Sequence, residues 1–336
     1  MSVCYENICW APLLNQLMQP LQPPSHCQLN WSRYASIKKR MEPPRFITAE
    51  WLKQEIQKPD CKIRVVDATW HRPDWKRNAS AEHESCRIKG AVHMNLNVVR
   101  DTESDWPNAI PSREHFEKCI GDLGITNDTP VVLYDNNEDV GMYSVARAWL
   151  LFKLFGHTHV AILDGGIPSY LKSGGPTESG PPHTPQSATY KASFIKADQT
   201  RSYEQMLFNF KEKLEQVVDA RSAGRFDGTE PEPNPNLPSG HMMGAYNIPY
   251  GNFLRSDTKT MKSAEELKIV FQEAGVDLDK PVVATCGSGI TACWIVVAGL
   301  LCGMKSVPLY DNSWTEWVHM APADTKTVGV KGVDMK

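Results

Sequence analysis

The chain has 336 residues, of which 41% are hydrophobic and 22% are charged, and its formal net charge is −3. This length allows two domains of ordinary size, and the charge balance argues against nucleic acid or an anionic membrane as a partner. The nine cysteines form no C-x2-C pair, and no apolar run approaches the roughly 20 residues of a membrane span. We therefore expect reduced thiols and a cytoplasmic or mitochondrial protein.

Residues 1–44 differ in composition from the rest of the chain. They are rich in proline, glutamine and serine, and Glu6 is the only acidic residue before Glu42. A basic group at 38–40 lies close to the end of this segment. An acid-poor stretch of this kind predicts either a disordered extension or a mitochondrial transit peptide.

Capping residues and apolar periodicity predict alternating helices and strands after this segment. Three helix starts are marked by Thr48, by Ser202 with Gln205, and by Ser263 with Glu266. Short valine-rich runs bounded by Pro, Gly or Asp predict buried parallel strands between the helices. The alternation predicts an α/β fold in which each parallel sheet is flanked by helices on both faces.

Four segments of the first half recur in the same order about 150 residues later. The segments at 65–68, 88–91, 130–135 and 163–166 return at 217–220, 242–245, 281–286 and 309–312. Order and spacing held over four segments indicate a duplicated domain. The stretch between the copies is rich in Pro, Ser, Thr and Gly, which is typical of a linker. We expect domains at 45–173 and 200–322, a linker at 174–199 and a tail at 323–336.

The second copy carries a cysteine between a predicted strand and a predicted helix. The strand is 282–285 and the apolar helix is 291–302, which Gly303 ends. The loop between them consists of Cys286, Gly287, Ser288, Gly289 and Ile290, and it leads into Thr291. Backbone N–H groups of such a loop and the helix N-terminus form a cradle for an anion, and glycines permit backbone angles that a Cβ would forbid.

The anion in this cradle is expected to be the sulfur of Cys286. An ordinary thiol has a pKa of ~8.5, and a helix terminus supplies only ~0.3–1 kcal/mol of the stabilisation that a useful thiolate needs. The N–H donors of the loop and a nearby cation must supply the rest. The alternative is a buried core cysteine, which we predict for Cys293 and Cys302 inside the apolar helix. A phosphatase C-x5-R loop is excluded, because Ala292 stands where the arginine is required.

The cysteine loop and three other segments resemble the tandem rhodanese family, and within it the 3-mercaptopyruvate sulfurtransferases. The segments are 224–233, 240–245, 286–292 and 311–317, and the resemblance covers about residues 46 to 320. It implies two rhodanese-like domains, of which the N-terminal one is non-catalytic, because Asp135 stands in place of its cysteine.

The resemblance also implies the chemistry. Cys286 takes sulfur from 3-mercaptopyruvate as a persulfide, pyruvate leaves, and a thiol such as thioredoxin, or cyanide, accepts the outer sulfur. No metal or organic cofactor is implied. Thiosulfate-preferring relatives carry basic residues where this chain has Gly287 and Ser288. Two alternatives stay open: a thiosulfate sulfurtransferase, and a low-turnover persulfide carrier or regulatory scaffold.

Two further residues of the second copy match positions with a role in the family. Arg225 matches the arginine that faces the substrate carboxylate, a task that suits the planar guanidinium. The alternative for Arg225 is an ion pair with a glutamate such as Glu230. Ser288 is expected to donate to the substrate or the thiol, or else only to bond backbone in a turn. Arg221 is predicted to be structural.

Three asparagines depart from the family pattern. The second substrate arginine falls on Asn234, and the aspartate and histidine of the first copy fall on Asn97 and Asn108. A lost charge-assisted contact costs about 1.5–3 kcal/mol. The sequence therefore predicts that the persulfide chemistry is retained while binding of the substrate is weakened or altered.

Two other groups of residues have less specific signals. His157 and His159 are predicted to lie in a surface turn, with a metal site as the weaker alternative. Trp314 and Trp317 are predicted either to wall the active cleft or to pack beneath it.

Overall fold

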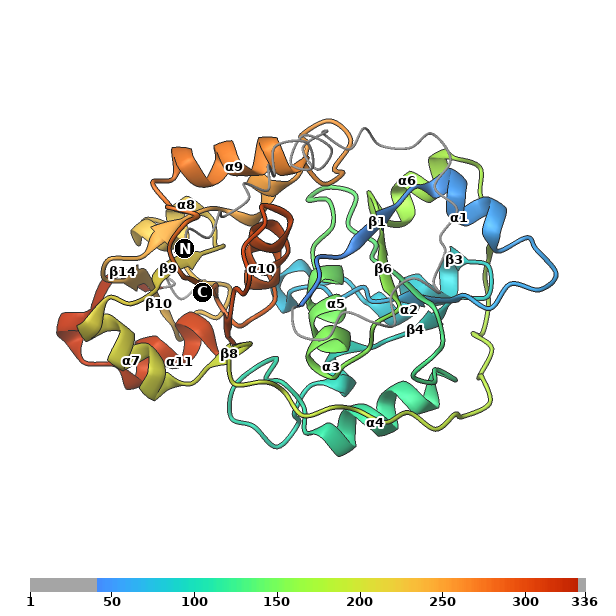
Figure 1. Ribbon diagram of the computed structural model, residues 1–336, viewed down its shortest axis with the longest axis horizontal. Coiled ribbons are helices and arrows are strands. Elements are labelled where there is room, and N and C mark those ends of the chain that lie inside the picture. The colour runs from blue at the N-terminus through green and yellow to red at the C-terminus, as the bar shows by residue number, and fades with distance from the viewer. Residues whose placement is uncertain (1–40, 332–336) are drawn as a thin grey trace, which may run out of the picture. The chain divides into compact units, whose positions relative to one another are not determined.

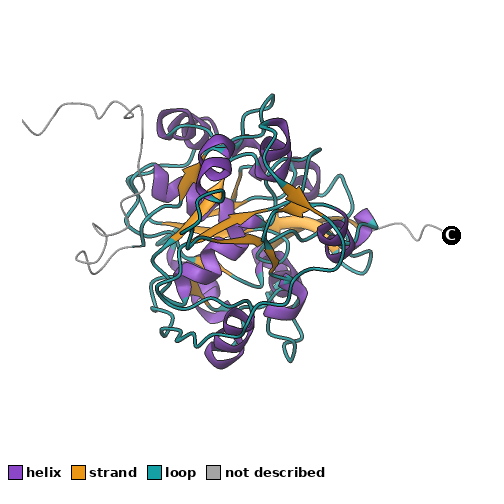
Figure 2. Cartoon of the chain, turned by 90° about the vertical axis from the view of Figure 1, so that its right-hand side faces the viewer, coloured by secondary structure: helices purple, strands orange, loops and turns teal. Residues whose placement is uncertain are grey.

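The computed structural model describes residues 41–331 and contains two sheets of five parallel strands each, flanked by helices (Figure 1). Figure 2 shows helices on both sides of the strands, which confirms the predicted fold class. The predictions for residues 1–40 lie outside the described residues. Within 41–331, no helix is long and apolar enough to cross a membrane.

The first sheet has the strand order β1-β6-β5-β2-β4. Its strands are β1 (Arg45–Ile47), β2 (Arg64–Asp67), β4 (Val92–His93), β5 (Val131–Tyr134) and β6 (Val160–Leu163). Its helices are α1 (Ala49–Glu55), α2 (Ala79–Ser85), α3 (Leu96–Val99), α4 (Arg113–Asp122), α5 (Val145–Leu154) and α6 (Gly166–Lys172).

The second sheet repeats this topology, with the order β8-β13-β12-β9-β11. Its strands are β8 (Thr200–Arg201), β9 (Gln216–Asp219), β11 (Tyr246–Asn247), β12 (Val282–Thr285) and β13 (Leu309–Tyr310). Its helices are α7 (Tyr203–Glu212), α8 (Ala223–Asp227), α9 (Ala264–Glu273), α10 (Ala292–Leu301) and α11 (Ser313–Met320). The equivalent strand order confirms the duplication that the sequence indicates.

The predicted helix starts are confirmed by their hydrogen bonds. The Thr48 hydroxyl accepts from Trp51 N–H, and Ser202 and Ser263 each form a complete capping box with the residue three positions later. Each box satisfies two backbone N–H donors at an otherwise open helix end. Local sequence therefore fixes where these helices begin.

Two short antiparallel pairs complete the structure. β3 (Arg87–Ile88) pairs with β7 (Thr177–Glu178), and β10 (Pro238–Met242) pairs with β14 (Lys326–Lys331). The segment predicted as a linker packs on the first copy, because Tyr190 is buried and Ser193 N–H donates to the Phe155 carbonyl at 2.9 Å. We propose that the second domain begins near residue 200, after this packed connection.

The two copies meet through α5 and α10, which pack against each other (Figure 1). The Trp294 indole N–H of α10 donates to the Tyr143 carbonyl at 3.0 Å, just before α5 begins. Buried apolar residues of both copies form one continuous core around this contact. The cysteine loop before α10 and the loop before α5 are therefore held side by side.

The prediction for His157 needs correction, and the structure decides between the two alternatives for Trp314 and Trp317. His157 does not lie on a surface turn: it is buried, and its Nε2 lies 3.0 Å from the Thr129 carbonyl. No group of ligands suited to a metal ion occurs among residues 41–331. Trp314 and Trp317 are both 1% exposed and pack in the core of the second copy, away from the cavity described next, so the packing alternative holds for both.

Candidate active site

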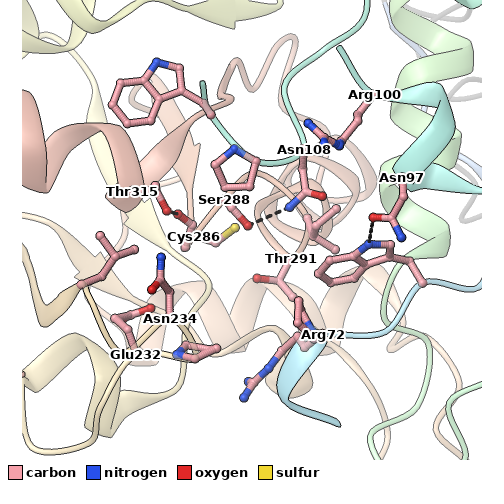
Figure 3. A pocket seen from close by; sticks show the side chains of 18 of the residues that line it. Arg72, Asn97, Arg100, Asn108, Glu232, Asn234, Cys286, Ser288, Thr291 and Thr315 are labelled. Atoms are coloured by element: carbon pink, nitrogen blue, oxygen red, sulfur yellow. Dashed lines mark hydrogen bonds between the residues drawn. The ribbon is translucent and has the colours of Figure 1, made fainter. Parts of the chain in front are cut away.

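A cavity of about 860 Å³ is lined by both copies (Figure 3). The first copy contributes, among others, Trp70, Arg72, Asn97, Arg100, Asn108 and Tyr143. The second contributes, among others, Arg225, Glu232, Asn234, Cys286, Gly287, Ser288, Ile290, Thr291, Thr315 and His319. All the residues that the sequence assigns to the cysteine loop or to substrate binding, except Gly289, therefore line one cavity, although they come from distant parts of the chain.

Cys286 lies directly after β12 and lines this cavity, with only 2% of its surface exposed. Its N–H donates to the Ser313 hydroxyl at 3.0 Å, and its carbonyl accepts from Trp314 N–H at 3.0 Å. The next carbonyl, of Gly287, accepts from the Thr315 N–H at 3.0 Å and the Thr315 hydroxyl at 2.8 Å. The start of α11 thus fixes the backbone of the cysteine loop.

The two glycines of the loop serve different purposes. Gly289 has φ +80°, and a Cβ there would collide with the Asp311 carbonyl, so the predicted conformational reason holds. Gly287 has no positive φ, and the predicted reason is wrong for it. A Cβ at Gly287 would instead lie 2.7 Å from Arg225 Nη2, so the absence of a side chain makes room for the guanidinium.

Arg225 sits over Gly287 as a result, and its ion pair differs from the predicted one. Its Nη2 donates to Glu232 Oε2 at 2.5 Å, rather than to Glu230. The other oxygen of Glu232 accepts from Arg221 Nη1 at 2.8 Å. Arg225 Nε is buried and has no hydrogen-bond partner in the described chain.

The structural role predicted for Arg221 fits its surroundings. Its guanidinium donates to both carboxylate oxygens of Asp219, at the end of β9. It also lies 4.9 Å from the centre of the Trp314 ring. Arg221 is 1% exposed and does not line the cavity, so it supports Glu232 from behind.

Ser288 is contacted by the first copy. The Asn108 amide Nδ2 donates to the Ser288 hydroxyl at 2.9 Å (Figure 3). Asn108 is held in the left-handed region, with φ +60°, and its carbonyl accepts from Arg147. Of the three departures from the family pattern, Asn108 is the one that touches the cysteine loop.

Asn97 and Asn234 lie on the cavity wall with other partners. Asn97 Oδ1 accepts from the Trp70 indole at 2.9 Å, and Asn234 Oδ1 accepts from Asn236 N–H at 3.1 Å. Neither contacts Cys286 or Ser288 by a hydrogen bond. Both sites present neutral amides to the cavity where a charge is expected from the resemblance.

Arg147 was not identified from the sequence, yet it joins the two copies at the loop. Its guanidinium donates to the Gly289 carbonyl at 3.2 Å, to Asp311 Oδ1 at 2.5 Å and to the Asn108 carbonyl, and it is 2% exposed. The available signal was an arginine in the first turn of α5, a helix whose remaining residues are apolar apart from Lys153 near its end. A buried guanidinium requires several acceptors, and here the first copy supplies one, the Asn108 carbonyl, while the second copy supplies the other two.

Cys293 is clearly distinguished from Cys286. Burial raises the pKa of the Cys293 thiol to about 12, and the thiol donates to the Gly289 carbonyl at 3.2 Å. A thiol with this pKa stays protonated at neutral pH, so it cannot serve as a nucleophile there. Among residues 41–331, Cys286 is the cysteine that lines the cavity.

The equivalent loop of the first copy holds a carboxylate in place of a thiol. Asp135 follows β5, and its Oδ2 accepts from the N–H groups of Tyr143, Ser144 and Val145 at 2.7, 2.8 and 3.0 Å. Burial raises the pKa of Asp135 to about 6 despite these bonds. The start of α5 is therefore an anion cradle, which supports the same interpretation of the start of α10.

The fold and the site define a protein of two α/β copies with a single cysteine loop in the second. The chain belongs to the rhodanese family: the model of the rhodanese-like domain matches residues 48–173 and 202–320. Thiosulfate sulfurtransferase of Rattus norvegicus is 41% identical over 283 residues, which cover 83% of this chain and 94% of that protein. 3-Mercaptopyruvate sulfurtransferase of Homo sapiens is 40% identical over 286 residues, covering 84% and 95%.

Solved structures are similar to this chain as well. Tum1 from Saccharomyces cerevisiae has a TM-score of 0.76 at 30% identity and covers 86% of this chain and 99% of that one. SseA from Escherichia coli, described as a 3-mercaptopyruvate sulfotransferase, has a TM-score of 0.72 at 29% identity, covering 81% and 99%. The chain is therefore a sulfurtransferase, an enzyme that moves sulfur between small-molecule donors and acceptors.

Proposed function

We propose that the protein moves sulfane sulfur from 3-mercaptopyruvate to a thiol or cyanide acceptor through a persulfide on Cys286, and that pyruvate is released. One observation carries this proposal: Cys286 lines a cavity between the two copies, where its loop presents the uncharged Gly287 and Ser288. A loop without cations suits a donor with a single carboxylate better than a compact dianion.

In the first step the Cys286 thiolate attacks the sulfur of the donor. A sulfur–sulfur bond forms, the carbon–sulfur bond of the donor breaks, and its electron pair stays on carbon as the enolate of pyruvate, which then takes up a proton. In the second step an acceptor such as thioredoxin or cyanide attacks the outer sulfur, and the Cys286 thiolate is restored. Neither step requires a metal or an organic cofactor.

The hydrogen bond between Asn108 and Ser288 sets the direction of the serine proton. An amide N–H can only donate, so the Ser288 oxygen accepts from Asn108 and its own O–H is available to the donor or to the Cys286 sulfur. Asn108 cannot take up a proton as a histidine would. Ser288 therefore acts in this proposal as a hydrogen-bond donor to developing negative charge, and Arg225 binds the donor carboxylate.

The second copy is expected to bind the donor more weakly than a second copy that contributes two arginines. Asn234 presents an amide to the cavity, and Arg225 is already paired with Glu232. Losing one charge-assisted contact reduces affinity by roughly ten- to a hundredfold. Asn234→Arg is accordingly expected to lower the Michaelis constant for 3-mercaptopyruvate, and an unchanged constant would count against this role for position 234.

The donor is tested directly by intact mass. The purified protein is incubated with 3-mercaptopyruvate or with thiosulfate, and the gain of one sulfur atom is measured together with pyruvate release. Cys286→Ser should abolish the gain, while Cys119→Ser, which removes a half-buried thiol outside the cavity, should keep it. Sulfur uptake by Cys286→Ser would refute the proposal.

Two alternatives are outcomes of the same measurement. Uptake from thiosulfate alone would assign thiosulfate as the donor, which the similarity to the rat thiosulfate sulfurtransferase supports. Uptake from neither donor would leave a persulfide carrier or regulatory scaffold. We also propose a cytoplasmic or mitochondrial location, because the reducing conditions of these compartments keep cysteines as free thiols. Cell fractionation would test this location.

A further inference from the structure

The three arginines that line the cavity differ in how they are paired. Arg225 shares an ion pair with Glu232, and Arg72 donates to both oxygens of Asp74, at 3.0 and 2.5 Å. Arg100 forms no ion pair within 4.0 Å in the part of the chain that the structure describes. Its guanidinium donates one hydrogen bond there, from Nη1 to the neighbouring Asp101 carbonyl, at 3.1 Å.

The charges around Arg225 cancel within a small cluster. Arg221 and Arg225 bring two positive charges, and Asp219 and Glu232 bring two negative ones, so the four side chains sum to zero. The pair of Arg72 and Asp74 cancels in the same way. Among residues 41–331, the cavity arginine without a carboxylate partner within 4.0 Å is therefore Arg100, and it is free to pair with an anionic donor.

The backbone holds Arg100 close to the cysteine loop. Asp101 N–H donates to the Ala109 carbonyl at 2.9 Å, which brings the two ends of the segment 100–109 together. Asn108, beside this closure, donates to Ser288. Figure 3 shows Arg100 on the Asn108 side of the cavity and Asn234 on the other side of Cys286. Arg100 is half-buried, and four of its five N–H donors are unused within residues 41–331.

We infer that Arg100 binds the anionic group of the sulfur donor, either an α-keto carboxylate or the sulfonate end of a thiosulfate. It would supply from the first copy the second positive charge that Asn234 does not supply from the second. This inference rests on the proposed reaction at Cys286 and adds a specificity-determining residue to it. Guanidinium suits the role because it offers two parallel donors to either oxyanion.

Asp105 has the opposite electrostatic effect on an anionic donor. It lines the same cavity, is exposed, and makes no ion pair within 4.0 Å in the described chain. Its carboxylate repels an anionic donor at close range. Removing Arg100 or Asp105 should thus shift donor binding in opposite directions.

The test is steady-state kinetics of Arg100→Met and Arg100→Lys with 3-mercaptopyruvate and, separately, with thiosulfate. We expect the Michaelis constant of Arg100→Met to rise ten- to a hundredfold, with kcat at saturating donor within about twofold of wild type. The Michaelis constant of Arg100→Lys should lie between those of wild type and Arg100→Met. Asp105→Asn should lower the Michaelis constant. A rise with only one of the donors assigns that anion to Arg100.

Controls separate binding from a general structural effect. Arg113→Met removes an arginine that pairs with Glu114 outside the cavity, and it should leave both constants unchanged. Discharge of a preloaded persulfide to neutral dithiothreitol should proceed at the wild-type rate in Arg100→Met. Slowed discharge, an equal effect of Arg113→Met, or unchanged constants with both donors would overturn the inference.

Failure of the underlying proposal is distinguishable from failure of this inference. If wild-type protein loads no sulfur, or if Cys286→Ser loads it, the reaction at Cys286 is wrong. If wild type loads sulfur and Arg100→Met has the wild-type Michaelis constant with both donors, only the role of Arg100 is wrong.

Discussion

Replacing Gly289 by alanine should damage the active site far more than the same replacement at Gly303. Both glycines have positive φ, +80° and +99°. An alanine in this region costs about 1–2 kcal/mol at either position. At Gly303 the new methyl group meets no atom within 4 Å. The backbone cost is therefore the same at both positions, and any larger effect at Gly289 comes from the collision of its new methyl group.

At Gly289 the collision is with backbone, which cannot rotate away. The new Cβ would overlap the Asp311 carbonyl and would lie 2.9 Å from Asp311 Oδ1 and 3.3 Å from Arg147 Nη1. Since ordinary contacts begin at 3.4 Å, the loop must move by about an ångström. Overpacking of this kind costs about 1–3 kcal/mol more, and a displacement of an ångström at a reacting group costs about a hundredfold in rate.

Two measurements check this reasoning. Urea unfolding should show Gly303→Ala destabilised by about 1–2 kcal/mol and Gly289→Ala by about 2–5 kcal/mol. Quenched single-turnover loading of sulfur, followed by intact mass, should be about a hundredfold slower only in Gly289→Ala. Loading at the wild-type rate in Gly289→Ala, or an equal loss in Gly303→Ala, would refute the account of the loop.

Three further predictions address the surroundings of the site and the core. In Gly287→Ala the new Cβ would lie 2.7 Å from Arg225 Nη2 and should displace that guanidinium. The Michaelis constant for the donor should rise with little change in kcat, and a large fall in kcat would contradict this prediction. Arg147→Met should lower the free energy of unfolding by roughly 3–5 kcal/mol, since it leaves the Asp311 carboxylate without its partner, and urea unfolding measures this. Burial lowers the pKa of His157 to about 4, so unfolding takes up a proton between pH 6.5 and 4. The free energy of unfolding should therefore fall by roughly 3 kcal/mol as the pH is lowered through that range. His157→Gln should flatten this fall, and an unchanged pH dependence of urea unfolding would count against it.

Signals that act within a few residues could be interpreted from the sequence alone. The capping boxes at Ser202 and Ser263 each span four residues, and both are present in the structure. The strand before Cys286 and the apolar helix after it also lie where predicted. The alternation of strands and helices predicted the fold class, and the repeat predicted that this fold occurs twice, because two copies of one pattern are expected to fold in the same way.

Local patterns do not reveal which charged groups meet. Glu230 is nearer to Arg225 in the chain than Glu232 is, yet the structure pairs Arg225 with Glu232, which Arg221 also holds. Arg147 and Asp311 are 164 positions apart. No spacing rule connects residues at that separation.

The sequence by itself therefore determined the duplicated α/β architecture and the cysteine loop of the second copy. Only the tertiary structure decided that Asn108 reaches Ser288, that Gly287 makes room for Arg225, and that Arg100 lines the cavity without an ion pair among residues 41–331. The physical reason is range: caps and periodicity depend on neighbours along the chain, whereas ion pairing in the cavity depends on how α5 and α10 bring the two copies together.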